Sequence, residues 1–517
     1  MQEIYGGDQS FVLKGRFHMH FSPLLGRKDM IGCVLCKDAP CTAACGRVDI
    51  AALLRSIWFD NEVSAATKLS KSFPCHECAA PCESACLAPE KVSIRSLLIR
   101  LHDEVLPEIE YVSEDDRLKT DLCGVPMENP FLLSSSVVAS TYDMCARAFE
   151  AGWGGVCFKT ICNFEIHEAS PRFSAIKGDN GTIIGFKNIE QLSDHSVAEN
   201  MKIFRELKKN YPSKFILASI MGQNEQEWTE LARQCEENGA DSVELNFSCP
   251  NMANDGLGSD IGQIPELVER YTAAAKRGCR IPVLAKLTPN VQSLVPAALA
   301  AKRGGADGLA AINTIKSIVR VNLHTYVSSP AVHGMSAVGG YSGNAVKPIA
   351  LRMIAELGWE DELKPMHISG MGGIETWRDA MEYILLGCRS VQVTTAVMQY
   401  GYRIIDDLKS GLNRYLLEKG FDSIRDAVGL GLGAVNASTD VLERDTVVYP
   451  RFQRDSCIGC GRCVISCMDG GHQAISLDLN RKPVLNLRKC VGCHLCVLVC
   501  PTESIQPYNR RSTPIIE

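Results

Sequence analysis

The sequence predicts an α/β fold, a (β/α)8 barrel that lies between two cysteine-rich segments. Eight short apolar runs alternate with helical segments between residues 121 and 403, as they do in parallel βα units. Eight is the strand number of a closed parallel barrel, and glycines end several of the helical segments. The cysteines are distributed unevenly along the chain, with eight in residues 33–86 and eight in 457–500. We therefore expect three domains, with a TIM barrel in the middle: 1–115, 116–445 and 446–517.

The composition excludes several classes of protein. The 517 residues carry 54 lysines and arginines against 60 aspartates and glutamates, without long single-sign blocks, so we expect no nucleic-acid partner. No run approaches the roughly 18 apolar residues of a membrane helix, and the first residues lack the apolar core of a signal peptide. We therefore expect a soluble, cytoplasmic protein, in which 24 cysteines indicate metal or redox chemistry rather than disulfides.

The expected strands are short apolar runs rich in β-forming residues. They span residues 131–137, 154–160, 215–221, 242–247, 282–287, 308–313, 366–371 and 390–395. A doubly wound sheet is the alternative arrangement of such units, and it favours a GxGxxG turn that opens a helix near its first strand. No such turn follows the first run, which favours the barrel.

The C-terminal cysteines show the spacing of a two-cluster ferredoxin domain. Each run has three cysteines in CxxCxxC spacing and a fourth after three further residues. Three thiolates of a run bind three corners of one iron–sulfur cube, and the fourth points to the other cube. Zinc sites, the alternative, prefer pairs of CxxC. The predicted ligands are Cys457, Cys460, Cys463 and Cys500 for one [4Fe-4S] cluster and Cys490, Cys493, Cys496 and Cys467 for the second.

The N-terminal cysteines are spaced less regularly, but eight ligands again suit two [4Fe-4S] clusters. Apolar residues recur at helical spacing between and after the two runs, which predicts a helical iron–sulfur domain. We expect each cluster to take ligands from both runs. Zinc binding stays open as an alternative because the spacing is not that of a ferredoxin. The predicted ligands are Cys33, Cys36, Cys41, Cys45, Cys75, Cys78, Cys82 and Cys86.

Two glycine loops predict a phosphate site at the carboxyl ends of the strands. One follows the seventh expected strand, and barrels bind phosphate through backbone amides at that place and after the eighth strand. The other loop precedes a helix that opens at Ala345. FMN carries such a phosphate and is the predicted cofactor. The residues expected around its phosphate are Ser342, Gly343, Gly372, Gly373, Thr394 and Thr395.

Seven of the eight expected strands end in Lys, Asn, Ser or Thr. Since the chemistry of a barrel takes place at these ends, solvation alone does not explain so many polar residues. Lys286, at the end of the fifth strand, can lie against the N1–C2=O edge of a flavin and stabilise the reduced anion. The side chains expected to bind the flavin are Ser134, Ser135, Lys159 and Lys286.

The segment NFSCPN at residues 246–251 resembles the N-x-S-C-P loop of dihydropyrimidine dehydrogenases and class 1 dihydroorotate dehydrogenases. Supporting matches are AKLTPN at 285–290, AINT at 311–314, GYSG at 340–343 and NIE at 188–190. Because a ferredoxin-like tail follows the barrel, the chain is more similar to the dihydropyrimidine dehydrogenase family. The resemblance covers residues 30–505, since the N-terminal cysteine domain resembles the helical cluster domain of this family and of glutamate synthase small subunits.

The chain departs from the single-chain form of the family in one large respect. That form has FAD and NADPH domains between the N-terminal cluster domain and the barrel. Here about 35 residues separate Cys86 from the barrel, which leaves no room for them. The chain therefore resembles the FMN and iron–sulfur subunit of a split enzyme, supplied with electrons by a partner flavoprotein that binds FAD and NAD(P)H. The resemblance also implies a homodimer or heterotetramer.

The resemblance implies that Cys249 protonates C5 of a pyrimidine ring while FMN gives a hydride to C6. A thiol with a pKa near ~8.5 can donate a proton at neutral pH. Amide and hydroxyl side chains can face the alternating N–H and C=O groups of the ring, and Glu190 resembles the glutamate of the family's substrate loop. The residues expected to bind substrate are Asn188, Glu190, Asn246, Ser248, Asn251, Asn313 and Thr314.

Three hypotheses for function follow. The first is an oxidoreductase that reduces the C5=C6 bond of uracil or thymine to the 5,6-dihydropyrimidine. The second is the same flavin chemistry on another cyclic amide, such as dihydroorotate or a hydantoin-like ring, because Asn251 matches the dihydroorotate-type loop better. The third is an electron-transfer subunit whose barrel binds flavin but no substrate.

Overall fold

The computed structural model describes residues 25–30, 32–69, 75–109, 116–178, 181–251 and 257–508. The chain divides into two compact units, Met1–Val435 and Asn436–Glu517. The first unit contains N-terminal helices and a barrel, and the second contains the C-terminal cysteines. Within the described ranges, no helix has the length and apolar character needed to cross a membrane.

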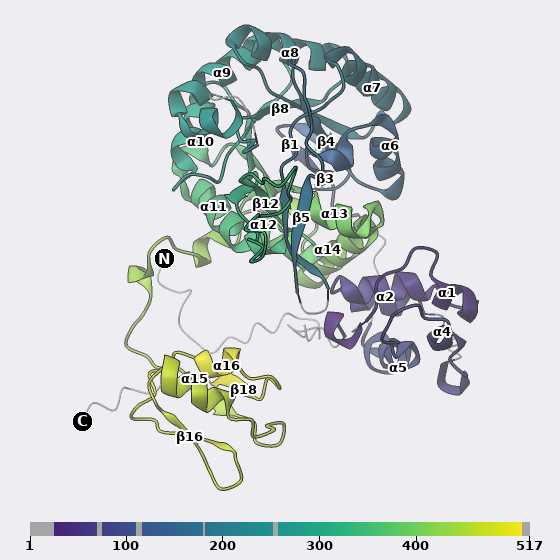
Figure 1. The fold of residues 1–517 in the computed structure, drawn as a ribbon, viewed down its shortest axis with the longest axis vertical. Helices are drawn as coiled ribbons and strands as arrows, with labels where there is room; N and C mark the ends of the chain where they lie inside the picture. Colours follow the sequence, from purple (N-terminus) through teal and green to yellow (C-terminus); the bar gives the residue numbers. More distant parts are fainter. Residues whose placement is uncertain are drawn as a thin grey trace. The chain divides into compact units, whose positions relative to one another are not determined.

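Eight parallel strands close into a barrel in the first unit (Figure 1). Around the barrel their order is the order of the chain, with the last strand paired to the first. Each strand overlaps one of the eight predicted runs, so the predicted TIM barrel is confirmed. The strands are β3 (Phe131–Leu133), β4 (Gly155–Ile161), β7 (Phe215–Ile220), β8 (Ser242–Asn246), β9 (Val283–Lys286), β10 (Gly308–Ala311), β13 (His367–Met371) and β14 (Cys388–Val393).

Amphipathic helices surround the strands, as Figure 1 shows. In α8 the buried residues Trp228, Leu231, Ala232 and Cys235 follow the three- and four-residue spacing of one helix face. Its first turn is capped by Asn224, whose side chain accepts a hydrogen bond from the backbone of Glu227. The helices are α6 (Tyr142–Ala151), α7 (Val197–Asn210), α8 (Glu225–Glu237), α9 (Pro265–Gly278), α10 (Val295–Arg303), α11 (Lys347–Trp359), α12 (Trp377–Leu385), α13 (Thr395–Tyr400) and α14 (Ile405–Lys419).

The amino ends of the barrel strands are closed by a hairpin of β1 (Thr120–Leu122) and β2 (Val125–Met127). Leu122 and Met127 are buried in one apolar cluster with residues from the barrel strands. This packing fills the lower end of the barrel and leaves the carboxyl ends of the strands for a site.

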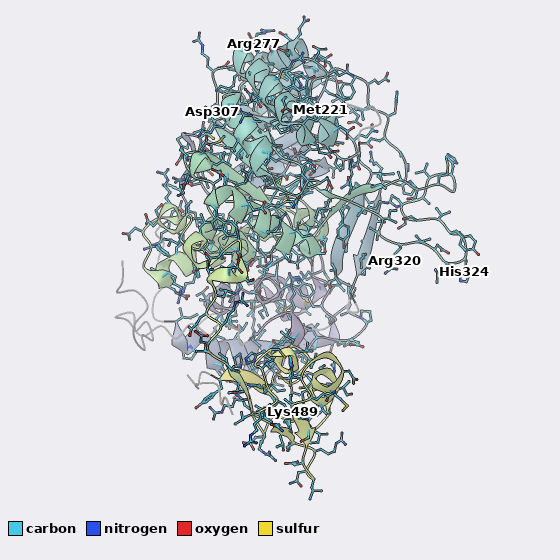
Figure 2. The ribbon with its side chains drawn as sticks, turned by 90° about the vertical axis from the view of Figure 1, so that its left-hand side faces the viewer. Met221, Arg277, Asp307, Arg320, His324 and Lys489 are labelled. Carbon is cyan, nitrogen blue, oxygen red and sulfur yellow. The ribbon has the colours of Figure 1, made fainter. Side chains whose placement is uncertain are left out.

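At the carboxyl ends, four more strands form an antiparallel sheet that the sequence analysis did not predict. Its order is β11 (Ile315–Ser317), β12 (Gly339–Ser342), β6 (Ile183–Asn188) and β5 (Phe173–Lys177). β11 follows directly on the residues that end β10, so the sheet lies beside the opening of the barrel. The long connection between β11 and β12 extends outward, and Figure 2 shows Arg320 and His324 on it, away from the barrel.

The N-terminal helices pack against the outside of the barrel through buried polar contacts. Arg55 donates to Asp407 of α14 over 2.6 Å, and the Asp407 side chain is fully buried. Ser56 donates to the other oxygen of the same carboxylate. The short helices of this region are η1 (Arg27–Met30), α1 (Pro40–Cys45), α2 (Ile50–Trp58), α3 (Glu62–Thr67), η2 (Cys75–Glu77), α4 (Pro81–Ser84) and α5 (Ile94–Arg100).

The second unit has a small core of its own. Two antiparallel strand pairs flank two helices, and Cys463, Cys467 and Cys496 are buried in the core with Ile475 and Ile505. Its elements are β15 (Tyr449–Phe452), α15 (Arg462–Gly470), β16 (Ile475–Leu477), β17 (Pro483–Leu485), α16 (Leu495–Leu498) and β18 (Ile505–Tyr508).

Candidate functional site

A cavity that is open to solvent lies at the carboxyl ends of the barrel strands. We call it the barrel cavity. The strand ends meet here because all eight strands are parallel. The predicted flavin and substrate residues that line it are Ser134, Ser135, Lys159, Asn188, Glu190, Asn246, Cys249, Asn251, Lys286, Asn313, Thr314, Ser342, Gly343, Gly372, Gly373, Thr394 and Thr395.

Ser248 was predicted to contact substrate and is not among the lining residues. Its side chain is fully buried. The hydroxyl donates to Asn246 over 2.9 Å and accepts a hydrogen bond from Asn313 over 2.8 Å. A contact between Ser248 and substrate therefore stays a prediction. In the structure Ser248 holds two amides that do line the cavity.

One end of the barrel cavity fits a phosphate group. Gly372 and Gly373 have φ angles of 131° and 74°, values that favour glycine. A Cβ on Gly373 would lie 2.8 Å from the backbone oxygen of Gly343, so this loop can carry no side chain there. Ser342 and Thr395 share a hydrogen bond of 2.9 Å between their hydroxyls. Backbone amides and hydroxyls of this kind are the donors that phosphate binding uses.

A buried charge pair lies below the middle of the barrel cavity. Lys286 is 3.1 Å from Glu244 and donates to Ser135 over 2.8 Å. Gln392 donates to the second oxygen of Glu244 over 3.1 Å. Burial alone would raise the pKa of Glu244, but Lys286 and Gln392 outweigh it and hold the pKa below its ordinary value. The network fixes the Lys286 ammonium on the wall of the cavity, and a fixed cation is a group that would stabilise the negative edge of a reduced flavin bound there.

Cys249 lies in the barrel cavity on the loop after β8, and only 7% of it is exposed. Burial raises the pKa of its thiol to about 11. The thiol is therefore protonated at neutral pH. A buried, protonated thiol on the wall of the cavity is suited to donate a proton to a ring atom on which negative charge develops.

Two chain segments meet above Cys249. Asn251 donates to the side chain of Asn188 over 3.0 Å and to the backbone of Glu190 over 2.8 Å. Lys159, at the end of β4, is 2.7 Å from Glu190. These contacts attach two predicted substrate residues, Asn188 at the end of β6 and Glu190 just after it, to the loop that carries Cys249.

Several residues that shape the cavity were missed by the sequence analysis. Glu168 lies 3.7 Å from Lys159 and accepts the backbone N–H of Gln191. Burial raises the pKa of Glu168. Glu244 and Gln392 lie within strands that are buried along almost their whole length. A polar residue inside a buried run is the signal that could have found these two.

The C-terminal cysteines surround two small cavities, in the sets that the sequence predicted as ligands. Cys457, Cys460, Cys463 and Cys500 line one of them. The set Cys467, Cys490, Cys493 and Cys496 lines the other. All 24 cysteines are free thiols, so four sulfurs are available at each cavity, as an iron–sulfur cube requires.

The N-terminal cysteines also surround two cavities. One is lined by Cys33, Cys36, Cys41 and Cys86. The other is lined by Cys45, Cys75, Cys78 and Cys82. Each set combines cysteines of both runs, the arrangement expected of crossed ligation. The sets are chemically suited to [4Fe-4S] clusters, which take four thiolates.

The comparisons with known proteins agree with this geometry. The family model "Dihydroorotate dehydrogenase" matches residues 117–416, and the model "4Fe-4S dicluster domain" matches residues 451–506. The NAD-dependent dihydropyrimidine dehydrogenase subunit PreA of Escherichia coli is 54% identical over 358 residues, which cover 69% of this chain and 87% of that protein. The chain belongs to the dihydropyrimidine dehydrogenase family. It is an oxidoreductase, and its C-terminal unit contains a 4Fe-4S dicluster domain.

Other members are more distant. The chloroplastic dihydropyrimidine dehydrogenase (NADP(+)) of Arabidopsis thaliana is 36% identical and the match covers 64% of this chain and 80% of that protein. The catalytic subunit of dihydroorotate dehydrogenase B (NAD(+)) of Pyrococcus horikoshii is 39% identical, over 61% of this chain and 98% of that protein. The family models match from residue 117 onward and leave the N-terminal helices outside.

Proposed function

We propose that this protein reduces the C5=C6 bond of uracil or thymine, with FMN in the barrel cavity and electrons that arrive through iron–sulfur clusters from a partner flavoprotein. The observation that carries the proposal is the protonated Cys249 thiol among amide side chains that line the same cavity. The name of the Escherichia coli relative, a dihydropyrimidine dehydrogenase subunit, supports the ring and the existence of a partner.

The residues of the barrel cavity divide into two groups under this proposal. Ser342, Gly373, Thr394 and Thr395 hold the phosphate of FMN, and Lys286 faces its ring. When bound, FMN supplies the hydride that is added to C6 of the pyrimidine. Asn188, Asn246, Asn313 and Thr314 offer amide and hydroxyl groups to the N–H and C=O groups of the substrate ring.

Cys249 completes the reaction by proton transfer. Hydride addition at C6 leaves negative charge on C5 and the adjacent carbonyl. The Sγ atom of Cys249 gives its proton to C5, so that one hydride and one proton saturate the double bond. Because burial raises the pKa of the thiol to about 11, the proton stays on sulfur until that charge develops.

The charges of the barrel cavity favour a neutral ring. Among its described lining residues the cations are Lys159 and Lys286, and each already faces a carboxylate, Glu190 at 2.7 Å and Glu244 at 3.1 Å. Uracil and thymine carry no charge, whereas dihydroorotate brings a carboxylate that needs a cation. Dihydroorotate remains the second candidate substrate because its dehydrogenase is 39% identical to this chain.

The proposal extends to the remaining parts of the enzyme. Four [4Fe-4S] clusters occupy the four cavities lined by cysteines, two in the N-terminal helical domain and two in the C-terminal unit. NAD(P)H and FAD bind to the partner subunit, and the assembly is a homodimer or heterotetramer.

A Cys249→Ala variant tests the acid. We expect uracil reduction to fall by about 10²- to 10⁴-fold, because the variant has no proton donor at this position. The matched control is Cys162→Ala, which removes another buried thiol that is not among the lining residues. Rates are compared at equal FMN and iron content. A Cys249→Ala protein that works at the wild-type rate would falsify the assignment.

The pH dependence is a second test of the same residue. Reduction needs the protonated thiol, so its rate stays level through neutral pH and declines as the pH approaches about 11. The reverse reaction, oxidation of dihydrouracil, needs the thiolate and rises over the same range. Both pH profiles can be measured with artificial electron donors and acceptors. If neither rate changes as the pH approaches about 11, the role of Cys249 is contradicted.

Ring binding separates the remaining hypotheses. Uracil, dihydroorotate and hydantoin are added in turn to the oxidised, flavin-loaded protein, and the flavin absorption spectrum is recorded. We expect uracil to shift the spectrum at the lowest concentration. A tighter response to dihydroorotate favours the second candidate, and no response to any ring favours an electron-transfer subunit.

A further inference from the structure

The N-terminal helical region reaches the wall of the barrel cavity through one ion pair. Arg27, in η1, donates to Glu375 over 3.0 Å, and only 5% of the Glu375 side chain is exposed. Glu375 lines the barrel cavity, two residues after Gly373 of the loop assigned to the FMN phosphate. The two partners are 348 residues apart in the chain.

The N-terminal helices fix the position of Arg27. Its Nε atom donates to the backbone oxygen of Trp58 over 3.0 Å, and its guanidinium lies 5.1 Å from the centre of the Trp58 ring. Trp58 and Phe59 pack edge-on against Tyr400, with ring centres 6.3 and 5.2 Å apart. Tyr400 ends α13, the helix that begins at Thr395 in the cavity.

A carboxylate beside a phosphate site is unfavourable unless a cation neutralises it. Two like charges close together in a partly buried place repel each other more strongly than they do in water, because the effective dielectric constant there is lower. Glu375 also has a carboxylate as a neighbour, because the side chain of Asp379 accepts the backbone N–H of Glu375. Lys347 faces Asp379 at 2.6 Å, which leaves Arg27 as the cation in contact with Glu375.

We propose that Arg27 is a positioning residue for the FMN phosphate, because it neutralises Glu375 and so lets the phosphate loop accept an anion. The N-terminal iron–sulfur domain thus completes the cofactor site of the barrel. The inference rests on the proposed flavin site. It assigns a role to a residue outside the family match, which begins at residue 117.

The role follows from charge, so a double-mutant cycle isolates it. The full-length, cluster-loaded protein is freed of flavin under anaerobic conditions, and FMN is titrated back while the loss of flavin fluorescence gives Kd. Arg27→Gln should weaken FMN binding by about tenfold or more, since it leaves the Glu375 carboxylate unpaired. Glu375→Gln alone should bind at least as tightly as wild type. The double variant should return to near the wild-type Kd.

Riboflavin serves as the matched probe, because it has the ring of FMN without the phosphate. Arg27→Gln should leave the Kd of riboflavin unchanged. The control variant is Arg100→Gln, which removes a partner of Asp29 in the same η1 segment without touching the cavity; its FMN Kd should equal that of wild type. Iron content is measured for each protein to show that the N-terminal domain is folded.

The outcomes separate the inference from the function on which it rests. If wild type binds FMN and Arg27→Gln binds it equally tightly, the role of Arg27 is wrong while the flavin site stands. Arg27 does not act through its charge if Arg27→Gln weakens the binding of FMN and riboflavin equally. The same conclusion follows if the double variant binds FMN as weakly as Arg27→Gln alone. If wild type binds no FMN, the proposed flavin site itself is wrong.

Discussion

The two cysteine-rich regions place their ligands in the same way but join the rest of the chain differently. In each region the fourth cysteine of one run lines the cavity of the other run: Cys45 and Cys86 exchange places in the N-terminal region, as Cys467 and Cys500 do in the C-terminal unit. The N-terminal region shares one compact unit with the barrel, whereas the C-terminal unit begins at Asn436.

In this chain, the spacing of the cysteines does not determine how their region is attached to the rest of the protein. The C-terminal runs have the regular ferredoxin spacing and the N-terminal runs do not, yet both bring eight thiols to two cavities. The N-terminal region additionally carries polar side chains such as Arg55 and Ser56 that reach a buried carboxylate of α14. A cysteine-rich helical region can therefore become part of the same compact unit as a barrel through a few buried contacts, while its cysteines keep the crossed arrangement.

The largest effect is expected from breaking the crossed ligand sets. Cys86→Ser and Cys500→Ser should each lose one cluster, about four of about 16 irons, since a cube needs four ligands. The double variant Cys33→Ser/Cys86→Ser should lose no more iron than either single change, because both residues line one cavity. Cys75→Ser/Cys86→Ser should lose about eight irons. Iron analysis and EPR of the reduced protein measure this, and the reverse pattern would show uncrossed sets.

A smaller effect, different in the two regions, is expected from removing one arginine from each. Arg55→Ala leaves the buried Asp407 carboxylate without its ion pair and should lower the free energy of unfolding by about 3–5 kcal/mol. Arg454→Ala removes the partner of Asp478, and the Arg454 side chain is 52% exposed, so about 1 kcal/mol or less is expected. Calorimetry of the cluster-loaded proteins compares them. If both variants lose a similar free energy of unfolding, the N-terminal region is not held to the barrel by a buried ion pair of greater strength than the exposed pair in the C-terminal unit.

The smallest effect should be the same in both regions, because it is local. Gly46 ends α1 with φ 63°, and Gly461 precedes α15 with φ 78°. An alanine at either position adopts a left-handed backbone conformation at a cost of about 1 kcal/mol. The same calorimetry applies to Gly46→Ala and Gly461→Ala. If one variant loses several times more free energy of unfolding than the other, the backbone at that glycine is more tightly constrained by its surroundings.

The barrel could be predicted from sequence because each of its strands is a short run rich in apolar, β-forming residues between helical segments. The antiparallel sheet beside its opening could not. β5 exposes Phe173 and Lys177 at its ends, and β12 begins with two glycines. Such strands lack the alternation of buried and exposed residues that identifies a strand in sequence. Their partners are also distant, since β6 pairs with β12 across about 150 residues.

The candidate site was predictable to the extent that its residues end barrel strands. Lys286 and Asn246 could be found in this way because parallel strands bring their carboxyl ends together. Ser248 was expected at the cavity but is not among the residues that line it, since side-chain direction in a loop does not follow from spacing. Glu375 and Arg27 could not be paired, since their contact depends on how the N-terminal helices pack on the barrel.

The antiparallel sheet has a consequence for engineering. Asn188 of β6 donates to the backbone of Gly340 in β12, and Ser342 of β12 donates to the backbone of Phe186 in β6. Under the proposed function, one strand pair thus carries a side chain for the substrate ring and a hydroxyl for the phosphate. Attempts to widen ring specificity through these strands will loosen cofactor retention as well. Asn313 and Thr314, which follow a barrel strand, are the better starting positions for a library of altered substrates.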